Sequence, residues 1–123
     1  MQGIRVLIVD DFVEWRQLVR RAIGEIADLQ NIREACDGEE AVEKARGWNP
    51  DLALLDIGLP KLNGIEAAQQ IRRLCPECRI IFFTENRSDD VIEECFRTGA
   101  SGYIFKSSGA NDLVTAIKAA MKK

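Results

Sequence analysis

The chain has 123 residues, of which 46% are hydrophobic and 30% charged; this length and composition fit one folded globular domain and argue against disorder. Its formal net charge of −3 argues against direct binding to DNA, because domains that neutralise phosphates are usually basic. It has no histidine, which excludes catalysis and metal ligation by histidine. No apolar run approaches the roughly 20 residues that cross a bilayer, so we expect no contact with a membrane.

The spacing of the apolar residues alternates between two periods along the chain. Short apolar runs predict five strands, and apolar residues three and four positions apart predict a helix after each strand. The expected strands are Ile4–Val9, Ile32–Cys36, Leu52–Leu55, Ile80–Phe83 and Tyr103–Phe105. The inward faces of the expected helices run from Trp15 to Ile26, Ala41 to Trp48, Ile65 to Cys75, Val91 to Phe96 and Leu113 to Met121.

Several helix ends carry recognisable capping residues. Asp37 stands three residues before Glu40, which is the spacing of a capped helix start. Ser88 is a good N-cap for the fourth helix, since two aspartates follow it in the first turn. Gly99 suits the C-terminal end of that helix.

The strict alternation predicts an α/β fold with a single doubly wound sheet. Parallel strands need crossover connections, and the helices supply them on both faces of the sheet. The expected strand at Ile32–Cys36 is the most polar and that at Tyr103–Phe105 is the shortest, so both suit sheet edges. We therefore expect five parallel strands in the flavodoxin-like order 2-1-3-4-5, with right-handed crossovers.

The chain has four cysteines, and Cys75 and Cys78 form a C-x-x-C pair. A redox pair of this kind follows a strand, at a helix N-terminus that lowers the thiol pKa. Here the pair follows an expected helix instead, and Pro76 indicates a helix end. Cys36 and Cys95 lie on other elements, which disfavours a zinc site of four cysteines. We expect reduced cysteines in a cytoplasmic protein, with a redox or metal role as the alternative.

Polar residues follow the carboxyl ends of four expected strands. Asp10 and Asp11 follow the first strand, Asp56 the third, Thr84 the fourth and Lys106 the fifth. In an open parallel sheet, ligands bind at this edge, where the strand order reverses. Neighbouring carboxylates repel one another, and an all-oxygen site favours a hard cation such as Mg²⁺, which often also holds phosphate. The pattern predicts a phosphoryl site with Asp56 as the nucleophile that forms an acyl phosphate.

In these residues the sequence resembles the receiver domain of two-component response regulators, over essentially its whole length. The segments that carry the resemblance are Val9–Asp11, Asp56–Pro60, Asn63-Gly64, Thr84 and Gly99–Lys106. Each segment alone is weak, but their order and their places at strand ends make the combination specific. The run Asp56–Glu66 is most similar to the subgroup whose members usually carry a C-terminal helix-turn-helix DNA-binding domain.

The resemblance implies a role for each site residue. Asp56 would accept a phosphoryl group from the phosphohistidine of a sensor kinase. Asp11 and Asp56 would bind Mg²⁺ directly, together with the backbone carbonyl of Gly58, and Asp10 would act mainly through water. Lys106 would pair with Asp56 and then with a phosphoryl oxygen.

The resemblance also implies a conformational switch. Thr84 would move to hydrogen-bond the phosphoryl group, and Tyr103 would swing into the space that Thr84 leaves. The surface of the fourth helix, fifth strand and fifth helix would change with them.

Two positions depart from the usual pattern of the family. Glu85 stands where many relatives have a small residue, and Ser107 stands where many have a proline after a cis bond. Gly58 and Asn86 flank the site and should influence how long a phosphoryl group survives.

The function implied is a phosphorylation-dependent signalling switch that assists only its own phosphorylation and dephosphorylation and is not otherwise an enzyme. Residues 1–123 would form the receiver domain, with no output domain in this chain. The partners implied are a sensor histidine kinase or a phosphotransfer protein, and a second copy of the chain in a homodimer. DNA would be reached only through an absent output domain.

Three alternatives remain beside this interpretation. A binding module that works without phosphate is suggested by the carboxylate of Glu85. A phosphatase or mutase with an aspartyl nucleophile is disfavoured, because Asp10-Asp11-Phe12 lacks the D-x-D spacing of those enzymes. A flavin-binding domain of similar fold is disfavoured because the loops are acidic where phosphate would lie.

Overall fold

The computed structural model of the chain describes residues 3–26, 28–29 and 31–122, so residues 1, 2, 27, 30 and 123 of the predicted domain lie outside the described residues. Five parallel strands pair in the order β2-β1-β3-β4-β5. They are β1 (Arg5–Val9), β2 (Asn31–Ala35), β3 (Leu52–Leu55), β4 (Arg79–Thr84) and β5 (Gly102–Phe105). The predicted doubly wound sheet is confirmed, with the polar strand β2 and the short strand β5 at its edges.

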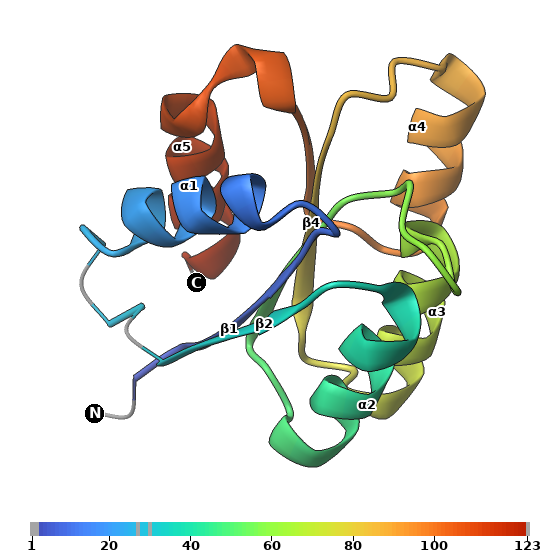
Figure 1. Ribbon diagram of the computed structural model, residues 1–123, viewed down its shortest axis with the longest axis horizontal. Helices are drawn as coiled ribbons and strands as arrows, with labels where there is room; N and C mark the ends of the chain where they lie inside the picture. The colour runs from blue at the N-terminus through green and yellow to red at the C-terminus, as the bar shows by residue number, and fades with distance from the viewer. Residues whose placement is uncertain (1–2, 27, 30, 123) are drawn as a thin grey trace.

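Helices cover both faces of this sheet, as Figure 1 shows. Helices α1 and α5 lie on one face, and α2, α3 and α4 lie on the other. Their bounds are α1 (Val13–Ile23), α2 (Gly38–Trp48), α3 (Gly64–Leu74), α4 (Asp89–Arg97) and α5 (Ala110–Met121), with a 3₁₀ turn, η1 (Lys106–Ser108), before α5. Within the described ranges, no helix has the length and apolar character needed to cross a membrane.

The two core layers follow from the alternation of side chains along the strands. On β1, Leu7 and Val9 pack into the layer under α2 and α3, whereas Val6 and Ile8 pack into the layer under α1 and α5. All four are at most 1% exposed. Full burial of such a side chain is worth about 1.5–3 kcal/mol, so the two-sided burial of the central strands stabilises the sheet that holds the site.

The predicted helix caps are present. Asp37 accepts a hydrogen bond from the Glu40 amide, and Ser88 caps α4 in the same way. The Glu40 carboxylate accepts from the Cys36 amide, and this bond holds the pKa of Glu40 down at about 2. Cys36, Asp37 and Glu40 also lie within metal-ligand reach of one another, but these bonds already account for their arrangement. Gly99 follows α4 with a φ of +89°, which favours glycine.

Three expectations about the helices were wrong. The first helix was expected to reach Ile26, but α1 ends at Ile23, where the Gly24 amide donates to the Arg20 carbonyl and closes the helix. Leu74 and Phe96 were expected to face inward, yet they are 38% and 47% exposed. The burial at the end of α3 is provided by Cys75 instead, and Phe96 packs against the ring of Tyr103 rather than under the sheet.

Burial decides the interpretation of the cysteines. Cys75, Cys78 and Cys95 are free thiols and are at most 2% exposed. Burial raises the pKa of Cys75, and it raises the pKa of Cys78 and of Cys95 to about 12. Cys36 is exposed, but its hydrogen bond with Glu40 raises its pKa as well. A redox pair needs an accessible thiolate, so a redox role of the C-x-x-C pair is not supported. Among the described residues, no group that could hold a metal ion includes Cys75, Cys78 or Cys95.

We predict that Cys36 reacts faster than the other three cysteines with a thiol-specific disulfide reagent in the native protein, because it is exposed and they are buried. Counting the released chromophore before and after unfolding in denaturant tests this. One thiol should react in the folded state and all four after unfolding. The Cys36→Ser variant is the control and should show no fast reaction. Modification of Cys75 or Cys78 at the rate of Cys36 would contradict the prediction.

Candidate functional site

The carboxyl edge of the sheet brings the predicted aspartates and lysine together. Asp10 follows β1, Asp56 follows β3, and Lys106 follows β5. The ammonium nitrogen of Lys106 lies 2.7 Å from Asp10 Oδ2 and 2.9 Å from Asp56 Oδ2. The side chains of Lys106 and Asp10 are 4% and 5% exposed. Because water scarcely reaches these contacts, their electrostatic interaction is stronger than that of a surface ion pair.

The charges of this cluster are not balanced. Burial by itself would lower the pKa of the Lys106 ammonium, but the hydrogen bonds to Asp10 and Asp56 outweigh burial and raise the pKa. Burial raises the pKa of Asp10, although the bond from Lys106 opposes that effect. With Asp10, Asp11 and Asp56 ionised, three carboxylates face one ammonium, and two net negative charges remain.

The acid cluster fits a divalent cation. One carboxylate oxygen each of Asp10, Asp11 and Asp56 lie within 4.8 Å of one another. Asp11 Oδ1 is buried and has no hydrogen-bond partner among the residues described, which is costly unless a ligand satisfies it. A set of oxygen ligands with excess negative charge suits Mg²⁺ rather than a softer metal. Gly58, whose carbonyl was the fourth predicted ligand, lines the cleft beside Asp56.

Hydrogen bonds from neighbouring residues fix the two aspartates that contact Lys106. The Phe12 amide donates to Asp10 Oδ1 over 3.0 Å, and Arg16 donates to the Asp10 carbonyl over 2.7 Å. The Ile57 amide donates to Asp56 Oδ1 over 2.7 Å. One oxygen of each carboxylate is therefore held by its own loop and the other by Lys106, which fixes the direction of both carboxylates.

The Asn63-Gly64 pair has a steric role beside Asp56. Asn63 caps α3 by accepting a hydrogen bond from the Glu66 amide, and the Gly64 amide donates to the Ile57 carbonyl over 2.7 Å. A Cβ atom on Gly64 would lie 2.0 Å from the Asp56 carbonyl oxygen. Glycine is therefore required there because the helix start presses against the backbone of Asp56.

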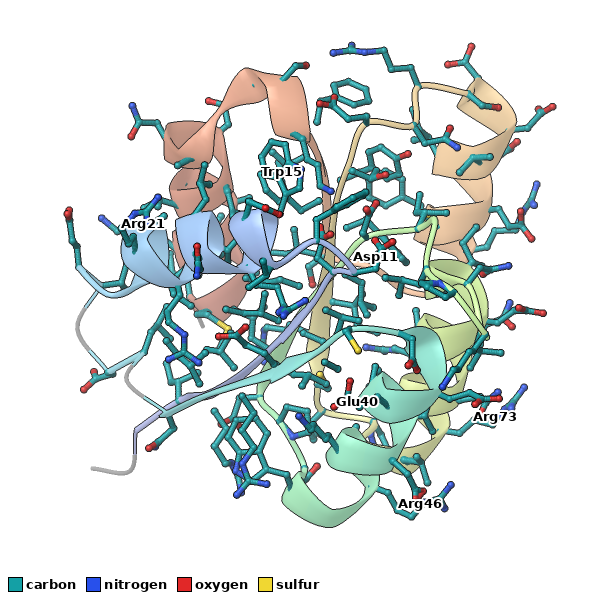
Figure 2. The ribbon with its side chains drawn as sticks, in the orientation of Figure 1. Asp11, Trp15, Arg21, Glu40, Arg46 and Arg73 are labelled. Carbon is teal, nitrogen blue, oxygen red and sulfur yellow. The ribbon has the colours of Figure 1, made fainter. Side chains whose placement is uncertain are left out.

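An open cleft of about 510 Å³ lies over Asp56 and Lys106. Its wall is formed by Phe12, Trp15, Asp56, Ile57, Gly58, Thr84, Glu85, Asn86 and Lys106. Thr84 is buried and Glu85 is exposed, and both line this cleft together with Asp56. Asp11 and Trp15, labelled in Figure 2, both lie at the N-terminal end of α1, at this edge of the sheet.

The predicted switch residues are connected through Asn86. The Asn86 amide donates to Thr84 Oγ1 over 3.3 Å, and the Asn86 carbonyl accepts from the Tyr103 hydroxyl over 2.7 Å. Tyr103 does not line the cleft; its ring packs against three phenylalanines. The structure thus brings Thr84 to the acid cluster and holds Tyr103 outside it. The peptide bond before Ser107 is trans, as are all described peptide bonds.

The contacts of three residues at this site went unrecognised in the sequence, although Asn86 was already expected to flank it. Arg16 holds the Asp10 carbonyl and pairs with Glu34 at 2.7 Å. Asn86 connects the two switch residues, and Trp15, expected only to pack, also lies over Lys106 with 4.7 Å between Nζ and the ring centroid. Their proximity to the acid pair and to the fourth strand was visible in the sequence, but the contacts with Glu34, Tyr103 and Lys106 join segments that are far apart in the chain.

Comparison with known proteins identifies the family of the chain. The model of the response regulator receiver domain family matches residues 6–118. The transcriptional regulatory protein DegU of Brevibacillus brevis is 32% identical over 115 residues, which cover 94% of this chain and 49% of that protein. The chain therefore spans about half the length of this curated relative.

Solved structures have the same fold. A two-component response regulator of the LuxR family from Aurantimonas superposes with a TM-score of 0.88 and 36% identity, covering 96% of this chain and 84% of that one. The complex of CheX with CheY, BeF₃ and Mg²⁺ from Borrelia burgdorferi gives a TM-score of 0.89 and 28% identity, over 99% of this chain and 92% of that one. The predicted fold and the resemblance in sequence are both confirmed.

We predict that Gly64→Ala destabilises the protein by about 1–3 kcal/mol, as overpacking generally does, because the new methyl group would displace the Asp56 backbone. Gly47→Ala is the matched control: Gly47 is helical, and a Cβ atom added to it would have no neighbouring atom within 4 Å, so this variant should gain about 0.4–1 kcal/mol. Denaturant unfolding measures both. Equal stability of the two variants would contradict the steric role.

Proposed function

The chain belongs to the response regulator receiver domains, the phosphorylation-dependent switches of two-component systems, and we propose that Asp56 is its phosphoacceptor. The observation that carries the proposal is the position of Asp56. Among the described residues, it is the one carboxylate that both contacts Lys106 and lines the open cleft, together with Gly58 and Thr84. Asp10 also contacts Lys106, but it is 4% exposed and less accessible to a donor.

The transfer uses the carboxylate of Asp56 as nucleophile. One carboxylate oxygen attacks the phosphorus of a phosphohistidine, the P–N bond breaks, and its electron pair leaves with the imidazole, which takes up a proton. Lys106 then shifts its pairing from the Asp56 carboxylate to a phosphoryl oxygen and offsets charge that the transfer brings into the site. Asp10 keeps the ammonium at the cluster throughout.

Domains of this family bind Mg²⁺, and we propose Asp11, Asp56 and the Gly58 carbonyl as its direct ligands here, with Asp10 acting through water. When bound, Mg²⁺ neutralises the excess negative charge and orients the phosphoryl oxygens. The orphaned oxygen of Asp11 supports this assignment. Removal of repulsion between the carboxylates makes the site accessible to an anionic donor.

The switch is proposed to run through Asn86. If Thr84 turns to donate to the phosphoryl group, the Asn86 amide loses its acceptor, and the β4–α4 loop is released from β4. Tyr103 is held by the carbonyl of the same residue, so a shift of Asn86 also frees the Tyr103 hydroxyl. The ring can then move toward the space beside Thr84, and the surface of α4, β5 and α5 changes.

The wider role follows from the family. Receiver domains interact with histidine kinases or phosphotransfer proteins. We propose such a partner here, an output domain that binds DNA outside these residues, and residence in the cytoplasm. The chain is proposed to assist only its own phosphorylation and dephosphorylation. We also propose that two copies of the domain form a homodimer.

We predict that acetyl phosphate with Mg²⁺ adds one phosphoryl group to the wild-type chain and none to Asp56→Asn, as measured by intact mass. Asp112→Asn, an exposed aspartate on α5, is the matched control and should react as the wild type does. Omission of Mg²⁺ should abolish the adduct. An adduct on Asp56→Asn would move the acceptor elsewhere. If neither acetyl phosphate nor beryllofluoride modified the wild type, the binding module that works without phosphate would replace this proposal.

We predict that Mg²⁺ raises the unfolding temperature of the wild type, since ligand at roughly 100 times its dissociation constant adds about 2.7 kcal/mol of stability. Asp11→Asn should lose most of this gain. Without Mg²⁺ the same variant should unfold at or above the wild-type temperature, because it removes one of three repelling carboxylates. Thermal scans with and without Mg²⁺ test both signs, and an equal Mg²⁺ gain in both proteins would contradict the assignment of Asp11.

A further inference from the structure

Trp15 connects three parts of the site. Its indole ring lies 4.7 Å from the Lys106 ammonium nitrogen and meets the ring of Phe83 edge-on, with 5.7 Å between centroids and 84° between planes. Phe83 directly precedes Thr84 on β4, and Trp15 also lines the cleft above Asp56. The ring is therefore held by the strand that carries Thr84 while its face is turned to the lysine.

Lys106 needs a restraint of this kind. A lysine side chain is a flexible stem with a compact charge and three donors, and Lys106 begins the short turn η1 rather than lying within a strand. Asp10 and Asp56 accept from it. The third side of the ammonium faces the ring of Trp15, where the negative ring face attracts a cation and excludes water.

We propose that Trp15 is a positioning residue for phosphoryl transfer, acting through Lys106. The proposal rests on the proposed role of Asp56 as phosphoacceptor. When Lys106 exchanges the Asp56 carboxylate for a phosphoryl oxygen, it gives up one of its two anionic contacts. The indole face keeps the ammonium over the cluster during this exchange, and an aliphatic side chain would fill the same space without attracting the charge.

The test compares three variants with the wild type. Trp15→Leu keeps an apolar side chain but removes the ring, and Trp15→Phe keeps a weaker aromatic face. Trp48→Leu is the matched control, because Trp48 also lies under a cation, with 4.6 Å between its ring and the Arg33 guanidinium, but on α2 and outside the cleft. Thermal scans establish that each variant is folded.

Phosphorylation is followed by intact mass with acetyl phosphate and with phosphoramidate, over a range of Mg²⁺ concentrations. In each reaction the bond from phosphorus to the donor breaks as the bond to Asp56 forms, and acetate or ammonia leaves. We expect Trp15→Leu to lower the rate at saturating Mg²⁺ by about three- to tenfold for both donors. Trp15→Phe should be intermediate, and Trp48→Leu should match the wild type. The Mg²⁺ concentration that gives half the maximal rate should stay the same, since Trp15 touches the lysine and not a metal ligand.

A spectroscopic readout tests the contact without any reaction. The aromatic ring current should shift the ε-methylene proton resonances of Lys106 upfield in the wild type and in Trp48→Leu. The shift should be smaller in Trp15→Phe and absent in Trp15→Leu. If Trp15→Leu were unfolded, the rate and the resonance shift of Trp15→Phe would decide the question.

Several outcomes would overturn the proposal. Unchanged rates in folded Trp15 variants would do so, as would an equal loss in Trp48→Leu. A loss confined to one donor would place Trp15 in donor binding, and a changed Mg²⁺ requirement would indicate a general disturbance of the site. If the wild type accepted no phosphoryl group and bound no beryllofluoride, the function of Asp56 would fail and this inference with it. Failure of the Trp15 proposal alone would look different, because the wild type and the Trp15 variants would then all accept the phosphoryl group at the same rate.

Discussion

The ammonium of Lys106, held between Asp10 and Asp56, is the contact on which the site depends. The two aspartates follow adjacent strands, β1 and β3, whereas the lysine follows β5 and must extend past the end of β4 to reach them. Buried like charges are costly unless an opposite charge compensates them. The strand order and the length of the lysine side chain together allow one ammonium to contact both aspartates. The three carboxylates still outnumber this one positive charge, so the site favours a bound cation.

The acidic side of the site is rigid because its loops approach one another too closely for side chains. A Cβ atom on Gly38 would lie 1.8 Å from the Leu62 carbonyl oxygen, and one on Gly64 would lie 2.0 Å from that of Asp56. The Gly38 amide also donates to the Pro60 carbonyl. The loop after β3 is therefore fixed between the start of α2 and the start of α3, which sets the position of the Gly58 carbonyl.

The opposite side of the cleft is held more loosely. The β4–α4 loop is exposed. It is attached to its neighbours by two hydrogen bonds of Asn86, which donates to Thr84 and accepts from Tyr103, and by the stacking of Arg87 on Phe105 at 4.1 Å. Exposed contacts of this kind are individually weak and open more readily than a packed core. One wall of the cleft is rigid and the other is an exposed loop. A new charge at Asp56 should therefore move the β4–α4 loop more readily than the acidic wall.

The sequence by itself determined the alternation of strands and helices, the edge strands, the caps at Asp37 and Ser88, and the convergence of the strand-end residues. These follow from local periodicity and from the general geometry of parallel sheets. Only the tertiary structure decided the exposure of Leu74 and Phe96, the link through Asn86 and the contact of Trp15 with Lys106. Each of these depends on how far one element lies from another, and periodicity in a single segment carries no information about the partner packed against it.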